Sequence, residues 1–267
     1  MDKDIIVIPD IHGRSFWKEA VEKYPDADTI FLGDYLDPYR HEHITPKEAI
    51  NNFHEILDYA RTHPNVTLLF GNHDLVYWFE YDWGRKITSW EDELLQEFRD
   101  NMDLFHMFTM REVNGKKWLF SHAPLFEEWI EYTEMPHDLK ELEAKIWQSL
   151  KEYNRLERGD GNWKEIRAKH DVVWRTLGRA SSLRGGGDKC GSPVWADVRE
   201  INDGCVLYKG ADYQVFGHTQ MDKPIITDTY ACLDTHQAYK VTPEGKIEAV
   251  TEKHTPPLPE DKGFSLF

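Results

Sequence analysis

The sequence predicts an α/β fold, because short apolar runs that suit strands alternate with longer patterns that suit helices. The strand-like runs each stop at a polar segment and span residues 5–8, 29–32, 66–70, 117–120 and 213–216. Helical patterns fill residues 15–23 and 46–62, where apolar residues recur at three- and four-residue steps. This order is typical of an α/β fold with right-handed crossovers. In such sheets ligands bind at the carboxyl ends of the strands.

The later part of the chain has a different pattern. Residues 125–169 are rich in Glu, Lys, Leu and Trp, which predicts helix, and they contain no cluster of metal-ligand type. We therefore expect a helical cap, inserted at about 125–190, over the strand ends of a single domain that spans 1–251. The glycines of 184–188 predict a flexible linker, and the proline-rich residues 252–267 predict a solvated tail.

Charge and length exclude several classes of protein. The 267 residues carry 32 basic and 48 acidic side chains, a net charge of −16. Such a chain is not suited to binding a nucleic-acid polymer or an anionic membrane, and no window reaches the roughly 18 apolar residues of a membrane span. We expect a cytoplasmic protein. Cys190, Cys205 and Cys232 lack C-x-x-C spacing and are predicted to be free thiols in a reducing compartment.

Polar residues that suit a metal centre follow the five predicted strands. They are Asp10, His12, Asp34, Asn72, His122 and His218. Each alone also fits an ordinary turn or a hydrogen-bonded histidine, but one face of the sheet would bring them together. Mixed carboxylate, imidazole and amide ligands suit manganese, iron, zinc and similar ions, and a carboxylate such as Asp34 can bridge two ions about 3.5–4 Å apart. No cysteine lies among them, which argues against a structural zinc site.

The motifs D-x-H-G, G-D-x-x-D, G-N-H-D, S-H-A and F-G-H-T occur in this order from Asp10 to His218. The set resembles the calcineurin-like metallophosphoesterase superfamily, in particular its serine/threonine phosphoprotein phosphatase branch and the bacterial and phage relatives. The resemblance implies a two-sheet β-sandwich flanked by helices, with two divalent metal ions at the loop ends. We expect manganese, with iron, zinc, nickel or cobalt as alternatives.

The resemblance also implies a role for each residue. Asp10, His12 and Asp34 would hold one ion, and Asp34 would bridge to a second ion held by Asn72, His122 and His218. His73 would be the general acid for the leaving oxygen, paired with Asp37. A carboxylate on one ring nitrogen fixes the tautomer of such a histidine and keeps its proton available.

The chain departs from the family pattern at the arginines that grip phosphate. The family continues G-D-x-x-D-R-G, but here Pro38 and Tyr39 follow Asp37, and a second family arginine is missing from 75–78. Arg40, Arg184 and Arg199 are the candidates to replace them. Arg199 follows a segment that loosely resembles the Leu-Trp-x-Arg segment of bacterial relatives. Each of the three also fits an ordinary surface arginine.

These observations predict a phosphoesterase that hydrolyses a phosphomonoester, on a phosphoprotein or a small molecule, by attack of metal-bound hydroxide. One alternative is a nucleotide phosphoanhydride or phosphodiester hydrolase, such as a dinucleoside polyphosphatase, which would share the same metal motifs. Another is a non-catalytic metal-binding scaffold, although inactive descendants typically lose a ligand or the acid histidine. We expect Asp234 to orient a neighbouring ligand and His236 to be a turn histidine. The oligomeric state stays open.

Overall fold

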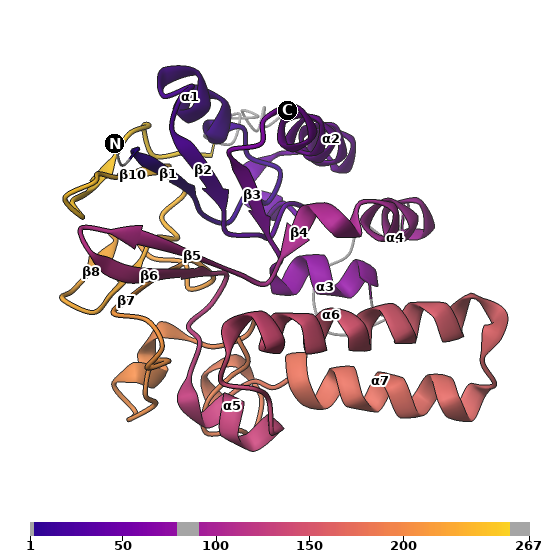
Figure 1. Ribbon diagram of the computed structural model, residues 1–267. Coiled ribbons are helices and arrows are strands. Elements are labelled where there is room, and N and C mark those ends of the chain that lie inside the picture. The colour runs from indigo at the N-terminus through magenta and orange to yellow at the C-terminus, as the bar shows by residue number, and fades with distance from the viewer. Residues whose placement is uncertain (1–2, 79–90, 257–267) are drawn as a thin grey trace, which may run out of the picture.

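The computed structural model describes residues 3–78 and 91–256, which form two β-sheets with helices on their outer sides (Figure 1). The first sheet has the order β11-β10-β1-β2-β3-β4, in which β1 to β4 are parallel, β10 pairs antiparallel with β1, and β11 pairs antiparallel with β10. Its strands are β1 (Ile5–Ile8), β2 (Asp28–Phe31), β3 (Val66–Leu69), β4 (Phe105–His106), β10 (Tyr239–Val241) and β11 (Ile247–Ala249). The predicted α/β sandwich is confirmed.

The second sheet has the order β5-β6-β7-β9-β8. Its strands are β5 (Phe108–Val113), β6 (Lys116–Ser121), β7 (Tyr213–Phe216), β8 (Ile225–Ile226) and β9 (Tyr230–Cys232). The central strands β6, β7 and β9 run parallel, and β5 and β8 close the edges in antiparallel pairs. The two strands that were predicted to end in histidine therefore lie side by side, as β6 and β7.

Burial on both faces explains why the strand-forming runs are apolar throughout. In β1, Ile5 and Val7 belong to the core between the two sheets, whereas Ile6 and Ile8 belong to the core under the helices. Side chains alternate between the faces of a strand, so a strand covered on both faces needs a continuous apolar run.

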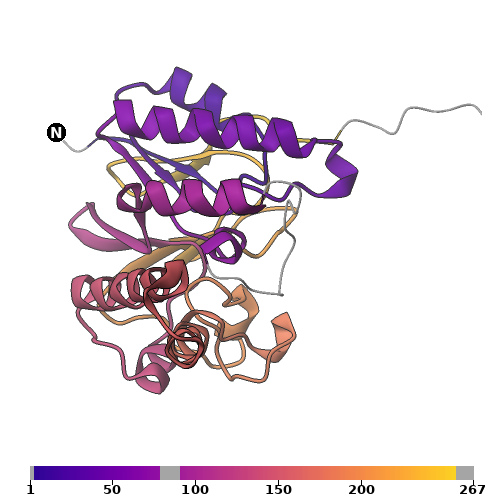
Figure 2. The same ribbon diagram turned by 90° about the vertical axis from the view of Figure 1, so that its right-hand side faces the viewer.

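Helices cover the outer faces of the sandwich (Figures 1 and 2). They are α1 (Phe16–Lys23), α2 (Pro46–Thr62), α3 (Asn72–Trp78), α4 (Glu91–Asp100), α5 (Glu127–Thr133), α6 (Leu139–Arg155) and α7 (Trp163–Leu177), with short helices η1 (Arg40–Glu42), η3 (Met102–Leu104), η4 (Leu156–Asp160), η5 (Ser182–Arg184) and η6 (Val198–Ile201). The start of α2 is set by a capping box between Thr45 and Glu48. Among the described residues no helix is long and apolar enough to cross a membrane.

The predicted helical insertion contains α5, α6 and α7. The last two form an antiparallel pair that lies beside α3 and α4 (Figure 1). Trp147 of α6 packs edge-on against Trp78 of α3 at 5.6 Å between ring centroids, and Arg99 of α4 pairs with Glu157. The following loop at 184–188 is not the flexible linker that its glycines predict. Backbone hydrogen bonds from Gly186 and Asp188 back to 180–181 close it into a turn.

Two of the cysteines are not free. Cys190 and Cys205, which are 15 residues apart, form a disulfide, and Cys232 is a buried free thiol. The prediction of three free thiols is therefore wrong for this pair. The segment 190–205 folds back on itself around the buried Glu200, whose carboxylate accepts hydrogen bonds from Gly191 N and Asp197 N. That fold brings the two ends of the segment together without any local spacing motif.

Candidate metal centre

Loops from five strand ends meet at one place in the sandwich. Asp10 and His12 follow β1, Asp34 follows β2, Asn72 begins α3 after β3, and His122 and His218 follow β6 and β7. Backbone hydrogen bonds join the loops, from His12 N to Asp34 O at 2.7 Å and from Gly217 N to His122 O at 2.9 Å. The structure brings all six predicted ligand positions together, and all six are buried.

The backbone at this place is strained in a way that positions the side chains. His12, Asp34 and His218 adopt positive φ angles of 45°, 54° and 62°. Such left-handed conformations are unfavourable for residues with a side chain and persist where the surroundings hold them. Strained backbone of this kind clusters at functional sites.

Two glycines of the motifs allow the backbone to approach the predicted ligands closely. A Cβ atom at Gly71 would overlap Asp34 Oδ1, and a Cβ atom at Gly217 would overlap Asp10 Oδ1. The glycines of G-N-H-D and G-H-T are therefore required by the space that the two carboxylates occupy.

Backbone carbonyls fix the ring orientation of two histidines. Nδ1 of His12 donates to Leu36 O at 2.9 Å, and Nδ1 of His122 donates to Leu32 O at 2.8 Å, since a carbonyl oxygen only accepts. In the neutral form of each ring, Nε2 then carries a lone pair. Burial holds the pKa of His12 well below its ordinary value, so this ring is neutral. This is the usual way in which a metal-binding histidine is oriented.

Asp34 lies between these two nitrogens. Its Oδ2 is 3.6 Å from His12 Nε2 and 3.6 Å from His122 Nε2, and its Oδ1 accepts a hydrogen bond from His73 N at 2.9 Å. Burial raises the pKa of Asp34, but the neighbouring His122, His73 and His12 outweigh burial and lower it. In the neutral His12 ring Nε2 carries no proton, so Asp34 cannot accept a hydrogen bond from it, and a cation fits between these two atoms better than a direct contact.

Two groups of possible ligand atoms share Asp34. Within each group the atoms lie within 4.8 Å of one another, and the groups are His12, Asp34 and His73, and Asp34, His122 and His218. Asn72 adds an amide oxygen 3.0 Å from His122 Nε2. Asp10 is in neither group, but its Oδ1 accepts a hydrogen bond from His218 N at 3.0 Å. Nitrogen and oxygen donors of these types fit a borderline divalent ion.

The predicted acid histidine and its partner are in contact. His73 Nδ1 lies 3.0 Å from Asp37 Oδ2, and the His73 ring is edge-on to His12 with 4.9 Å between centroids. Burial lowers the pKa of His73, but the charge of Asp34 and the hydrogen bond with Asp37 outweigh burial and raise it to about 9. The other oxygen of Asp37 accepts a hydrogen bond from the Tyr77 hydroxyl at 2.6 Å.

Of the three predicted phosphate arginines, two line a pocket beside His218 and one does not. Arg184 and Arg199 line this pocket of about 420 Å³, together with Tyr39 and His218. Arg184 Nη2 donates to His218 O at 3.1 Å and to Thr219 Oγ1 at 3.0 Å. Arg40 is exposed in η1 and does not line the pocket.

The comparisons with known proteins agree with this geometry. A model of the calcineurin-like phosphoesterase family matches residues 3–222. The chain belongs to this family. It is therefore a metal-dependent phosphoesterase, a hydrolase. No curated protein matches the chain at the threshold applied.

The fold of this phosphoesterase is similar to that of several solved structures. A cold-active protein-tyrosine phosphatase of a psychrophilic Shewanella species has a TM-score of 0.52 and 14% identity, over 94% of this chain and 81% of that one. Another structure of a cold-active protein tyrosine phosphatase has a TM-score of 0.55 and 14% identity, over 95% and 80%. Likeness at these identities concerns the fold alone.

Several residues that support the site were missed in the sequence. Asp74, the last residue of G-N-H-D, is fully buried, and its carboxylate accepts hydrogen bonds from the backbone N–H of Asp34, Tyr35 and Gly71. It ties the loop after β2 to the loop after β3. The motif itself was the signal, because an acidic residue that directly follows the ligand loop is placed to accept from that loop.

Asp197 was missed as well, and it had no such signal. Its buried carboxylate accepts two hydrogen bonds from Arg199, at 2.8 and 2.9 Å, and forms an ion pair with Arg184 at 2.9 Å. Burial raises the pKa of Asp197, but the Arg199 and Arg184 guanidinium groups outweigh burial and lower it. One carboxylate therefore holds both arginines of the phosphoesterase pocket.

Asp234 was predicted to orient a neighbouring ligand, and this stays a prediction. Asp234 is buried, and burial together with the negative charge of Asp10 raises its pKa well above the ordinary range. Asp234 Oδ1 has no hydrogen-bond partner among the residues that the structure describes. His236 is a buried residue with a φ of 61°, in a turn after β9.

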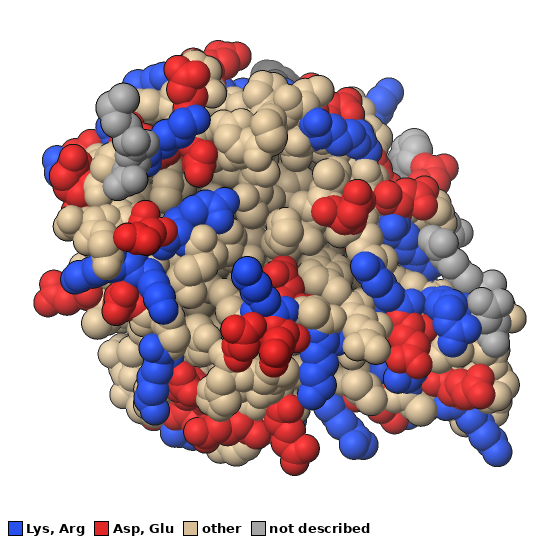
Figure 3. Space-filling model, viewed as in Figure 1, with Lys and Arg blue, Asp and Glu red and all other residues tan. Residues whose placement is uncertain are grey.

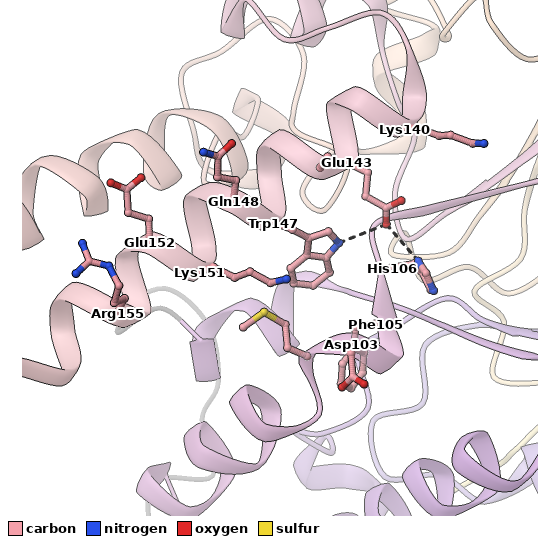
Figure 4. Close-up of a pocket in the computed structure, with 12 residues that line it drawn as sticks. Asp103, Phe105, His106, Lys140, Glu143, Trp147, Gln148, Lys151, Glu152 and Arg155 are labelled. Carbon is pink, nitrogen blue, oxygen red and sulfur yellow. Dashed lines mark hydrogen bonds and ion pairs between the residues drawn. The ribbon is translucent and has the colours of Figure 1, made fainter. Parts of the chain in front are cut away.

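A larger groove lies away from these residues (Figure 4). It has a volume of about 820 Å³ and is lined by residues of α6 and of the η3–β4 segment. Glu143 is fixed in it by Trp147 Nε1 at 3.4 Å and by His106 at 3.5 Å. None of the predicted ligand or acid residues lines this groove.

Proposed function

We propose that this phosphoesterase hydrolyses a phosphomonoester, of a phosphoprotein or a small molecule, at a centre of two divalent metal ions. The observation that carries the proposal is the equal distance of 3.6 Å from Asp34 Oδ2 to Nε2 of His12 and of His122. One carboxylate oxygen near the Nε2 atoms of two histidines, whose Nδ1 atoms each face a backbone carbonyl, is the arrangement expected of a bridging ligand.

Five further residues complete the two sites in this proposal. Asp10 and His12 hold the first ion with Asp34, and Asn72, His122 and His218 hold the second. Two such ions lower the pKa of a shared water and neutralise the charge of a phosphoryl group. Manganese is the proposed metal, since this mixed nitrogen and oxygen donor set suits it, and iron, zinc, nickel and cobalt are the alternatives.

His73 donates the proton to the leaving oxygen in this proposal. Its Nδ1 contacts Asp37, so Nε2 is the nitrogen that is left to face His12 and Asp34. Asp37 keeps the ring in one orientation and stabilises its protonated form. Asp37 is buried, whereas the His73 side chain is 15% exposed, so the ring that would donate the proton is still open to the site.

Arg184 and Arg199 bind the phosphate or its ester group in the proposal. Asp197 holds both guanidinium groups against the wall of the pocket beside His218. Because one carboxylate faces two guanidinium groups, a net positive charge is left for an anion. Lys and Arg are interspersed with Asp and Glu over the face shown in Figure 3, which supports a small or localised anionic substrate over a nucleic-acid polymer.

A substrate panel with Mn²⁺ tests the proposal. We expect hydrolysis of para-nitrophenyl phosphate or a phosphopeptide to exceed that of bis(para-nitrophenyl) phosphate and of a dinucleoside tetraphosphate. His73→Asn should lower turnover by ~10²–10⁴ and leave the metal content unchanged. His54→Asn is the matched control, because His54 pairs with Glu97 at the surface. Preference for the diester or the tetraphosphate, or loss of metal in His73→Asn, would contradict the proposal.

A further inference from the structure

The hydroxyl of Tyr77 contacts Asp37, the partner of His73 in the proposed acid dyad. The Tyr77 hydroxyl donates to Asp37 Oδ1 at 2.6 Å, while Asp37 Oδ2 lies 3.0 Å from His73 Nδ1. The two oxygens of one buried carboxylate are therefore occupied by two different partners. Asp37 itself has a positive φ of 64°.

The Tyr77 ring is held firmly. Tyr77 is completely buried in α3, and its ring stacks on Phe98 of α4 with an interplanar angle of 11° and 5.8 Å between centroids. Phe98 in turn stacks on Phe53 of α2 at 4.8 Å. A phenol that is fixed by packing loses little conformational entropy when its hydroxyl makes a hydrogen bond.

We propose that Tyr77 is a positioning residue for the acid step. It orients the Asp37 carboxylate, and Asp37 in turn holds the His73 ring so that its proton-bearing nitrogen faces the substrate. The proposal rests on the proposed function. Tyr77 does not touch the substrate. Its hydroxyl sets the rotation of the Asp37 carboxylate, and that carboxylate sets the tautomer and the tilt of the His73 ring.

If Tyr77 acts on the acid step, the effect of its substitution on activity should depend on the leaving group of the substrate. A purely structural role in core packing would lower activity on every substrate alike. An alkyl phosphate needs a proton on its leaving oxygen, whereas a nitrophenolate leaves without one, so loss of the acid step harms the alkyl ester selectively. Tyr77→Phe keeps the ring that stacks on Phe98 and removes the hydroxyl alone. We expect kcat for an alkyl phosphate to fall about tenfold, which corresponds to the lower end of the free-energy range of a hydrogen bond to a charged group. For para-nitrophenyl phosphate we expect a fall of less than about twofold, with KM and metal content unchanged.

Tyr35→Phe is the matched control. Tyr35 is also fully buried, and its hydroxyl donates to a backbone carbonyl, Leu69 O, at 2.8 Å. This variant loses a buried hydrogen bond without touching the dyad. We expect its ratio of alkyl to aryl activity to equal that of the wild type, whatever it loses in stability.

A double variant shows whether Tyr77 acts through Asp37. Asp37→Asn should reproduce the selective loss, and adding Tyr77→Phe to it should change the ratio no further. An unchanged ratio in Tyr77→Phe, or an equal loss for both esters, would overturn the inference. A wild-type ratio of alkyl to aryl activity in Asp37→Asn would overturn it too. If Tyr77→Phe does not fold, the Asp37→Asn variant alone tests the inference. Failure of the wild type to hydrolyse either ester with any divalent ion would instead refute the proposed function.

Discussion

Replacing Gly217 by alanine should weaken metal binding, although glycine carries no functional group. The new Cβ atom would overlap Asp10 Oδ1, and the backbone on which it stands is fixed by the hydrogen bond from Gly217 N to His122 O. The carboxylate of Asp10 must therefore rotate away. That rotation breaks the hydrogen bond that Asp10 Oδ1 accepts from His218 N at 3.0 Å.

The cost has two parts. Loss of a buried hydrogen bond to a charged acceptor lowers the free energy of unfolding by about 1.5–3 kcal/mol. Displacement of one proposed ligand lowers metal affinity by about 10–100-fold, as other disturbances of ligand orientation do, which corresponds to about 1.4–2.8 kcal/mol of binding free energy. This change in metal affinity should exceed the change caused by an alanine substitution at a glycine that has open space around it.

Calorimetric titration of metal-free protein with Mn²⁺ measures the affinity, and urea unfolding measures the stability. Gly187→Ala is the control, because a Cβ atom at Gly187 meets no atom within 4 Å. If Gly217→Ala bound Mn²⁺ as tightly as the wild type, Asp10 would not be a ligand whose position depends on Gly217.

Three further measurements test other parts of the structure. A thiol titration of the unfolded protein should count one free thiol, Cys232, without reductant and three after reduction. Three free thiols before reduction would exclude the Cys190–Cys205 disulfide. Asp197→Asn should raise KM for the phosphate ester about tenfold, because Arg184 and Arg199 lose the carboxylate that holds them. The metal content should not change. An unchanged KM would place both arginines outside the substrate site. The raised pKa values of Asp74, about 7, and His73, about 9, both favour the protonated forms in the fold, so the Tm of EDTA-treated protein should fall as pH rises from 6.5 to 9. Mn²⁺ should reduce that fall, and a Tm that rises over this range would show that these protons do not stabilise the metal-free fold.

The parts of the site that could be read from the sequence are those carried by short segments. An apolar run that ends just before Asp10 predicts both a strand and the position at which the strand stops. The same few residues therefore predict an element of the fold and a candidate ligand. His122 and His218 follow the same logic in the second sheet. Parallel neighbours bring such ends together within each sheet, and the packing of the two sheets against each other brings the two sets together.

The parts that could not be read depend on contacts between distant segments. Asp197 holds Arg184 only because the loop at 184–188 closes into a turn, and the glycines of that loop are equally compatible with a flexible linker. Cys190 meets Cys205 because the segment between them folds around a buried glutamate. Tyr77 is an aromatic residue in a helix, so its sequence context predicts a core residue, and it is indeed buried. Its contact with Asp37, 40 residues earlier, follows from the tertiary packing alone.

Charge balance gives an independent argument for two ions. Five carboxylates are buried around the centre, each 4% exposed or less: Asp10, Asp34, Asp37, Asp74 and Asp234. The buried Arg14 does not offset them, because it is paired with Glu42. Two divalent ions and a protonated His73 supply five positive charges, which matches the five carboxylates when all are ionised. A single ion would leave two of them to be neutralised by protons, and a buried unpaired carboxylate takes up a proton rather than keep its charge. An acidic chain could in this way bind an anionic ester, because the cations would offset the charge of its buried acidic residues.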